Sequence, residues 1–159
     1  MGKKADIDSV DRKILSILMK DANTSYVDIA KRIHVSPGTV HVRMKRLQRL
    51  GVVKKAFLNV DYSKLGYDIC AYLGIYLEKG SLYTDVIMAL QKIPEVVNAH
   101  YTTGIYSVFV RVICKDTEHL RRVLYEKIQE IDGIQRTETF ISLEESIYRS
   151  LSILEEGDE

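Results

Sequence analysis

Apolar residues recur with a helical period along the first fifty residues and predict three helices. The first helix carries one apolar face at i, i+4, i+7 and i+8, made by Val10, Ile14, Ile17 and Leu18. Asp8 is placed to cap this helix. Ser25 followed by Asp28 resembles a capping box and predicts a short second helix through Ile33.

The third helix is predicted over 36–51, because Ser36 is a capping residue, Pro37 suits the first helical position and Gly51 suits the end. The break of three to four residues before it is typical of a helix-turn-helix. His34 stands in that turn, where glycine is common, and histidine tolerates positive φ better than most residues. Residues 52–60 then predict a short strand that would form a wing.

Beyond residue 66 the pattern changes to alternating strands and helices in the order βαββαβ. The predicted strands are 69–78, 96–103, 106–114 and 134–143, and the predicted helices are 82–92 and 116–131. This order predicts a ferredoxin-like sandwich, with the helices on one face of an antiparallel sheet. The fold class is therefore α+β, a winged helix-turn-helix followed by a ferredoxin-like sandwich.

The predicted sheet is apolar on both faces. Leu73 and Ile75 alternate with Tyr72 and Tyr76 along its first strand. An antiparallel sheet with one face in water would alternate apolar and polar residues, so the second face is expected to pack on a partner. A homodimer joined through facing sheets is the simplest solution, and such a dimer would have two-fold symmetry.

Charge divides the chain at the same place as the hydrophobic pattern. Residues 1–60 hold 13 Lys/Arg and 5 Asp/Glu, whereas residues 61–159 hold 10 and 17, although the whole chain carries only +1. We therefore expect a basic domain at 1–60, a linker at 61–66 and a larger domain at 67–159.

The basic charge gathers around the third helix. Between Asp28 and Asp61 there is no acidic residue, and eight lysines and arginines fall in this window. A cationic helix face opposite an apolar seam is suited to a polyanion, and double-stranded DNA is the leading hypothesis. The alternative is a metabolite-binding module whose basic helix docks an acidic protein partner. Salt-dependent binding to duplex DNA would discriminate the two.

A helical wheel divides this region by expected role. Val40, Met44 and Leu47 form the core seam. Early positions on the other side are expected to read base edges, and later positions and the wing to hold phosphates. The candidate DNA contacts are Ser36, Thr39, His41, Val42, Arg43, Lys45, Arg46, Arg49, Lys54 and Lys55.

Other functional classes find little support in the sequence. The four histidines have no acid–nucleophile constellation around them, and neither a glycine-rich phosphate loop nor paired carboxylates stand out, so no catalytic residue is expected. Cys70 and Cys114 fit buried thiols in a reducing cytoplasm, and no metal site or cofactor is expected. No apolar run approaches 18 residues and no export signal is present, so we expect a soluble cytoplasmic protein without membrane contact.

Four segments together resemble the leucine-responsive regulator/AsnC family of transcriptional regulators. They are Ile7–Leu15, Ser36–Val52, the turn Thr102–Tyr106, and Gly133–Thr139 with its Thr-x-Thr pattern. The resemblance implies an effector-sensing domain, dimers that assemble into octamers or larger rings, and an amino-acid effector held between dimers. It points to Tyr101, Thr103, Gly104, Tyr106, Ser107, Thr137 and Thr139 as effector-binding residues.

Ser107 departs from the family pattern, in which this position is commonly an aspartate suited to an effector's ammonium group. A neutral hydroxyl cannot supply the charge-assisted bond, worth about 1.5–3 kcal/mol. Asp132 or Glu138 could substitute from a neighbouring loop. Otherwise the protein senses a different amino acid, a metabolite that is not an amine, or no effector.

Overall fold

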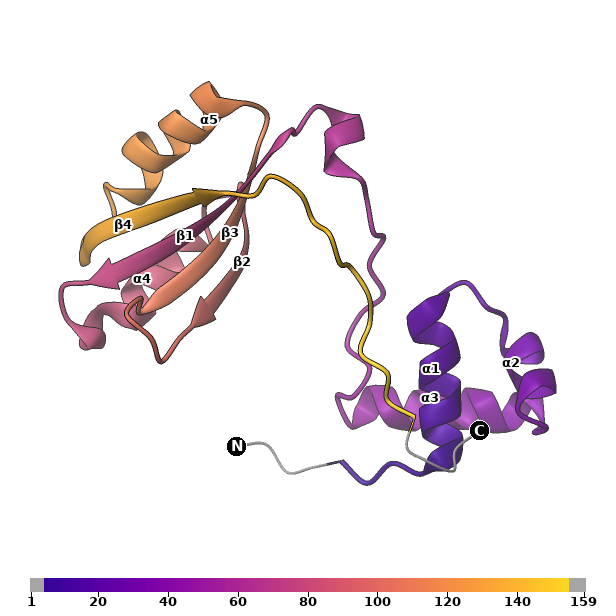
Figure 1. Cartoon of the computed structure of the whole chain (residues 1–159). Coiled ribbons are helices and arrows are strands. Elements are labelled where there is room, and N and C mark those ends of the chain that lie inside the picture. The colour runs from indigo at the N-terminus through magenta and orange to yellow at the C-terminus, as the bar shows by residue number, and fades with distance from the viewer. Residues whose placement is uncertain (1–4, 155–159) are drawn as a thin grey trace. The chain divides into compact units, whose positions relative to one another are not determined.

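The computed structural model describes residues 5–154, which divide into two compact units. The first unit takes the chain up to Leu58 together with the segment from Ile147 onward, and the second is Asn59–Ser146. The segment 147–154 therefore belongs with the N-terminal helices (Figure 1). This grouping differs from the predicted domain boundary, which places all of 67–159 in the second domain.

Three helices build the first unit: α1 (Ser9–Lys20), α2 (Tyr26–Arg32) and α3 (Pro37–Arg49). Each begins at a residue whose side chain accepts a backbone N–H of the first turn, Asp8, Ser25 and Ser36 respectively. Helix α3 contacts both other helices, and α1 crosses it in Figure 1. Their inward faces meet in one core centred on Ile14, Ile29, Val40 and Leu47, all fully buried. The predicted helices are thus confirmed.

The turn between α2 and α3 contains His34 at φ +55°, the positive φ that its position predicted. After α3, Gly51 at φ +70° reverses the chain, and the amides of Val52 and Val53 donate to Leu47 O. The strand predicted over 52–60 is not formed within the described chain, where these residues form a turn and then extended chain without strand pairing. Alternating apolar residues favour a strand, but a strand also needs a neighbour to pair with.

The segment 147–154 returns to the helices of the first unit. Ile153 packs against their core, and the hydroxyl of Ser150 donates to Met19 O at 3.3 Å. Leu151 stays largely exposed in the same segment. One apolar side chain of this segment thus contributes to a core that is otherwise built from residues 7–53.

The second unit is an antiparallel sheet of β1 (Ile69–Leu77), β2 (Val96–Tyr101), β3 (Val108–Cys114) and β4 (Ile134–Ile141). The strand order is β2-β3-β1-β4, so β2 and β4 are the two edges. With α4 (Tyr83–Leu90) and α5 (Thr117–Arg122) between strands, the order is βαββαβ, which confirms the ferredoxin-like fold (Figure 1).

Shorter helical turns complete this unit. The 3-10 turns η1 (Tyr62–Leu65) and η2 (Gly80–Leu82) precede β1 and α4. The helix predicted over 116–131 is α5 followed directly by a π-helix, η3 (Val123–Ile128), in which the amide of Gln129 donates to Leu124 O. The helix predicted over 116–131 is therefore confirmed in position, and its second half is wound as a π-helix.

The sheet has two chemically different faces. Leu73, Ile75, Val108 and Val110 are fully buried in the core together with residues of α4, α5 and η3. The opposite, open face carries Tyr72 of β1 stacked on Phe109 of β3, with ring centroids 5.8 Å apart, and Phe140 of β4, 48% exposed. The expectation that both faces are substantially apolar is confirmed within this unit.

Candidate DNA-binding and effector sites

Helix α3 presents one buried and one exposed side, as the wheel predicted. Val40, Met44 and Leu47 are buried, whereas Val42 is 64% exposed. His41, Lys45 and Arg49 are exposed. The exposed side of α3 thus combines cationic side chains with one apolar side chain, a surface that can meet another molecule.

The N-terminus of α3 is held by side-chain hydrogen bonds. Ser36 Oγ accepts from the Thr39 amide at 3.1 Å and lies 2.9 Å from Thr39 Oγ1. Ser36 therefore serves first as the helix cap. The ring of His41 lies 6.0 Å from that of Tyr26 in α2, which places the imidazole beside the neighbouring helix.

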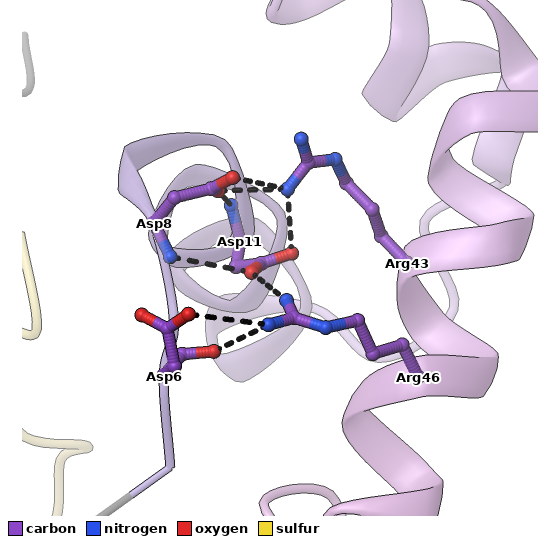
Figure 2. Close-up of polar contacts among 5 residues, drawn as sticks. All are labelled: Asp6, Asp8, Asp11, Arg43 and Arg46. Carbon is purple, nitrogen blue, oxygen red and sulfur yellow. Dashed lines mark hydrogen bonds and ion pairs between the residues drawn. The ribbon is translucent and has the colours of Figure 1, made fainter.

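Two arginines of α3 do not extend freely from the helix. Figure 2 shows Arg43 and Arg46 directed toward three aspartates at the start of α1. Arg43 Nη1 lies 2.7 Å from both carboxylate oxygens of Asp8 and 3.0 Å from Asp11 Oδ1. Arg46 Nη1 donates to Asp11 Oδ2 at 2.9 Å, and Arg46 Nη2 donates to the backbone carbonyl of Asp6 at 2.7 Å.

These contacts change the electrostatics of both partners. The hydrogen bond from Arg43, then that from the Asp11 amide, holds the pKa of Asp8 below its ordinary value of 3.8. The same carboxylates raise the pKa of Arg43, the hydrogen bond to Asp8 first and that to Asp11 next. Arg43 and Arg46 therefore meet any polyanion already paired, whereas no contact of this kind engages Lys45 or Arg49 among the hydrogen bonds and ion pairs of the described residues.

Asp11 belongs to this cluster and was not predicted from the sequence. Its side chain is fully buried, the only buried polar or charged residue among those described. The apolar period of α1 gave it no role, because it lies between Val10 and the core position Ile14. The sequence did contain a signal for this contact. Two aspartates stand three residues apart at the start of α1, and two arginines stand three residues apart on α3, so the two pairs could form ion pairs.

Lys54 and Lys55 lie on the exposed extended chain that follows α3. They belong to the first unit, as do all the candidate DNA contacts. Their charges therefore continue those of α3 along the sequence. In the structure both lysines lie on extended chain without strand pairing and not on a wing strand.

The candidate effector residues do not form one pocket within the chain. Tyr101 ends edge strand β2, where its ring lies 4.4 Å from that of Tyr83. Thr137 and Thr139 lie on the opposite edge strand β4, opposite Ile75 and Leu73 of β1. The two threonines are thus on the helix-covered side of the sheet at its other edge.

Tyr106 lies on the open face instead. Its ring packs over Gly74 of β1, and its hydroxyl donates to Glu138 Oε2 at 2.8 Å. Tyr76 donates to the other oxygen, Glu138 Oε1, at 3.0 Å. These bonds, that from Tyr106 first, lower the pKa of Glu138, and Glu138 in turn raises the pKa of Tyr106. Glu138 is thus already engaged by two phenols, on the opposite face from Thr137 and Thr139.

The turn that joins β2 to β3 carries the remaining candidates. Thr103 and Gly104 are exposed, and Ser107 is tied to β1 through its amide, which donates to Ile75 O at 2.9 Å. A Cβ added to Gly104 would meet nothing within 4 Å, and Gly104 does not have positive φ. The fold of this chain therefore does not require glycine at position 104.

Residues 5–154 contain no cluster of three or more His, Cys, Asp or Glu side chains placed to hold a metal ion. Within the same part of the chain, no helix has the length and apolar character needed to cross a membrane.

Comparison with known proteins matches both units. Residues 7–54 match the winged helix-turn-helix DNA-binding family model, and residues 70–151 match the Lrp/AsnC ligand binding domain. Regulatory protein AsnC of Haemophilus influenzae is 47% identical over 92% of this chain and 97% of its own length.

Solved structures agree with this match. The structure of Escherichia coli AsnC aligns with a TM-score of 0.87 at 41% identity, over 93% of this chain and 99% of that one. A transcriptional regulator from Neisseria meningitidis in complex with L-Met aligns with a TM-score of 0.86 at 19% identity, over 91% and 95% of the two chains. At that identity the second likeness shows the fold alone.

Proposed function

The chain belongs to the Lrp/AsnC family of transcriptional regulators, and we propose that it binds double-stranded DNA sequence-specifically through α3 as a homo-oligomer controlled by a small-molecule effector. In this proposal residues 1–60 form the DNA-binding domain, 61–66 the linker, and 67–159 the effector-binding and oligomerisation domain, whose segment 147–154 packs with the helices of the first unit. No catalytic step is assigned to it.

The exposed strip of α3 carries the DNA-binding part of the proposal. Thr39, His41 and Val42 are near the helix N-terminus, where a recognition helix contacts base edges. Val42 offers an apolar surface suited to a thymine methyl group. Lys45, Arg49, Lys54 and Lys55 are exposed cations that would hold phosphates and set the register.

Salt dependence tests this assignment. Binding of the protein to a duplex selected from a random-sequence pool should weaken linearly with log salt, because each phosphate contact releases condensed counterions. Replacing both Lys45 and Arg49 with Ala should lower the slope by about 2 and weaken binding to all sequences alike. The matched control replaces Lys79 and Lys92, exposed cations of the second unit, with Ala. Equal slopes for the two double variants would refute the α3 assignment.

The effector part of the proposal rests on the ligand-binding domain and on the separation of its candidate residues. Tyr101 and the pair Thr137 and Thr139 lie on opposite edges of one sheet, so a ligand that touches all three must lie between two copies. Gly104 lies three residues after Tyr101. The fold does not need glycine at this position, and the space beside its Cα is open. We propose an amino acid or a related metabolite as the effector.

Assembly is part of the same proposal. The open face carries the exposed Phe140 and the half-buried stacked pair of Tyr72 and Phe109, which a second copy facing it would cover. Dimers formed in this way would bring sheet edges together as octamers or larger rings. Light scattering of the purified protein would give the mass of the assembly.

A thermal-shift screen across the amino acids tests the effector. Gly104→Ala and Thr139→Val should each abolish the ligand-induced shift and leave the melting temperature of the free protein unchanged within about 1 °C. A shift that survives both changes would place the site elsewhere.

A further inference from the structure

Asp11 is a buried charge with two partners on another helix. Its side chain has no exposed surface, and a carboxylate is stable there only when paired and hydrogen-bonded. Asp11 Oδ1 accepts from Arg43 and Oδ2 from Arg46, while the Asp8 amide adds a third bond at 3.3 Å. One carboxylate thus joins the start of α1 to α3 at two points about one turn apart.

The two arginines share a strip of α3 with the proposed base readers. Thr39, Val42, Arg43 and Arg46 follow one another at i, i+3, i+4 and i+7, the spacing of a single helix face. The surface beside this strip is an open hollow lined by Asp8, Gly38, Thr39, Val42, Arg43 and Arg46. The contacts of Asp11 therefore hold α3 on the same side as the residues that would face the bases.

One edge of the Arg43 guanidinium can still donate hydrogen bonds to another acceptor. Its Nη1 faces Asp8 and Asp11, whereas Figure 2 shows the second terminal nitrogen pointing away from both carboxylates. A guanidinium has five N–H donors in a fixed plane, so one edge can be held while the other is presented. The Arg43 side chain is 26% exposed.

We propose that Asp11 is a positioning residue for DNA recognition: it holds Arg43 and Arg46 and thereby orients the Thr39–Val42 strip and the outer edge of Arg43 toward the DNA. This inference rests on the proposed function. It predicts an effect on the choice among sequences more than on the total affinity, because the buried side chain of Asp11 cannot itself contact DNA.

The direction of the effect makes the inference testable. Asp11 is a negative charge close to a DNA-binding surface, so its neutralisation should strengthen binding to every duplex if charge alone matters. A positioning role predicts the opposite for the preferred sequence. Asp11→Asn should reduce the ratio of affinities for a duplex selected by the wild-type protein and for a scrambled duplex of the same composition by roughly tenfold.

Asp6→Asn is the charge-matched control. The Asp6 side chain is fully exposed and 3.9 Å from Arg46, and its backbone carbonyl, which accepts from Arg46, is kept in the variant. Asp6→Asn should raise both affinities slightly and preserve their ratio. An Asp11→Asn protein that melts cooperatively and behaves like Asp6→Asn would overturn the inference.

Asp8→Asn covers the case in which Asp11→Asn does not fold. Asparagine caps a helix as well as aspartate, so α1 is retained while one carboxylate facing Arg43 is neutralised. The ratio should then fall a few-fold, and an unchanged ratio would overturn the inference. A wild-type protein that does not distinguish the two duplexes would instead refute the proposed function itself.

Discussion

The ring of Tyr106 lies directly on Gly74, so a Cβ added to this glycine would come closer than 3.0 Å to three ring carbons. Gly74 is paired with Phe109 and Glu138 on either side, and Tyr106 reaches Glu138 across the space that a side chain at position 74 would fill. Glycine is required here by close approach and not by backbone conformation, since Gly74 does not have positive φ. This single missing side chain lets a residue of the β2–β3 connection cover the open face.

Gly74→Ala should therefore destabilise the second unit by about 1–3 kcal/mol, because the ring must leave its place and lose its bond to Glu138. Urea denaturation followed by circular dichroism measures the change. Gly80→Ala is the matched control, since a Cβ at Gly80 meets nothing within 4 Å. Equal midpoints for the two variants would show that Tyr106 does not occupy this position.

Arg46 and Arg49 lie one turn apart on α3 and should differ in what they do for stability. Arg46→Ala removes a partner of buried Asp11 and should cost about 1–3 kcal/mol in the free energy of unfolding. Arg49→Ala, at an exposed position, should change it by less than about 0.5 kcal/mol. Thermal denaturation without DNA gives both values, and a larger loss for Arg49→Ala would contradict the ion-pair geometry.

Acid should weaken the first unit through Asp8. Its pKa is lower in the folded protein than the ordinary 3.8, so the folded state binds fewer protons there than the unfolded state. This contribution to stability is complete above pH 3.8 and is lost as the pH falls through 3.8 toward the folded pKa. Melting temperatures measured between about pH 5 and pH 3 should fall less steeply for Asp8→Asn than for wild type. Parallel curves would argue against the Asp8–Arg43 bond in solution.

Cys114 should be unreactive toward thiol reagents while the protein is folded. Burial, with the carboxylate of Glu95 adding to it, raises the pKa of the Cys114 thiol to about 11. At pH 8 about one thiol in a thousand would be ionised, and none of its surface is exposed. Ellman's reagent followed by mass spectrometry should modify Cys114 only after guanidinium is added. The Cys70→Ser variant isolates this signal, and rapid labelling of it in buffer would refute the burial of Cys114.

Ile153 should stabilise the first unit from the far end of the described chain. Ile153→Ala removes a half-buried side chain from the helical core and should cost about 1 kcal/mol. Leu151→Ala is the control two residues away, because Leu151 is 80% exposed. The two melting temperatures should differ by several degrees. Indistinguishable values would mean that the segment 147–154 does not pack on the helices in solution.

Features with local causes could be predicted from the sequence. Helix α3 begins after Ser36 and ends before Gly51 because its cap, its proline and its terminal glycine are all within the segment. The succession of strands and helices along the second unit, βαββαβ, follows in the same way from the alternating periods of its segments. His34 adopts positive φ because the turn geometry demands it at that one position.

Features that depend on distant partners could not be predicted. Residues 52–60 have the composition of a strand, but no neighbour within the described chain pairs with them. The burial of Asp11 depends on two arginines more than thirty residues away. The place of Tyr106 depends on the register that brings Gly74 beside Glu138. In each case the outcome depends on a residue that is distant in the sequence or on a missing pairing strand. Local periodicity therefore cannot predict it.

The packing of Ile153 in the helical core also determines when this core can be completed during translation. A ribosome makes α1, α2 and α3 first, then the whole of Asn59–Ser146, and only then the segment that carries Ile153. The helical unit therefore starts to form earliest and acquires its last packing residue after the sheet has been translated. A nascent chain stalled before Ile147 would expose three assembled helices whose core is still one side chain short.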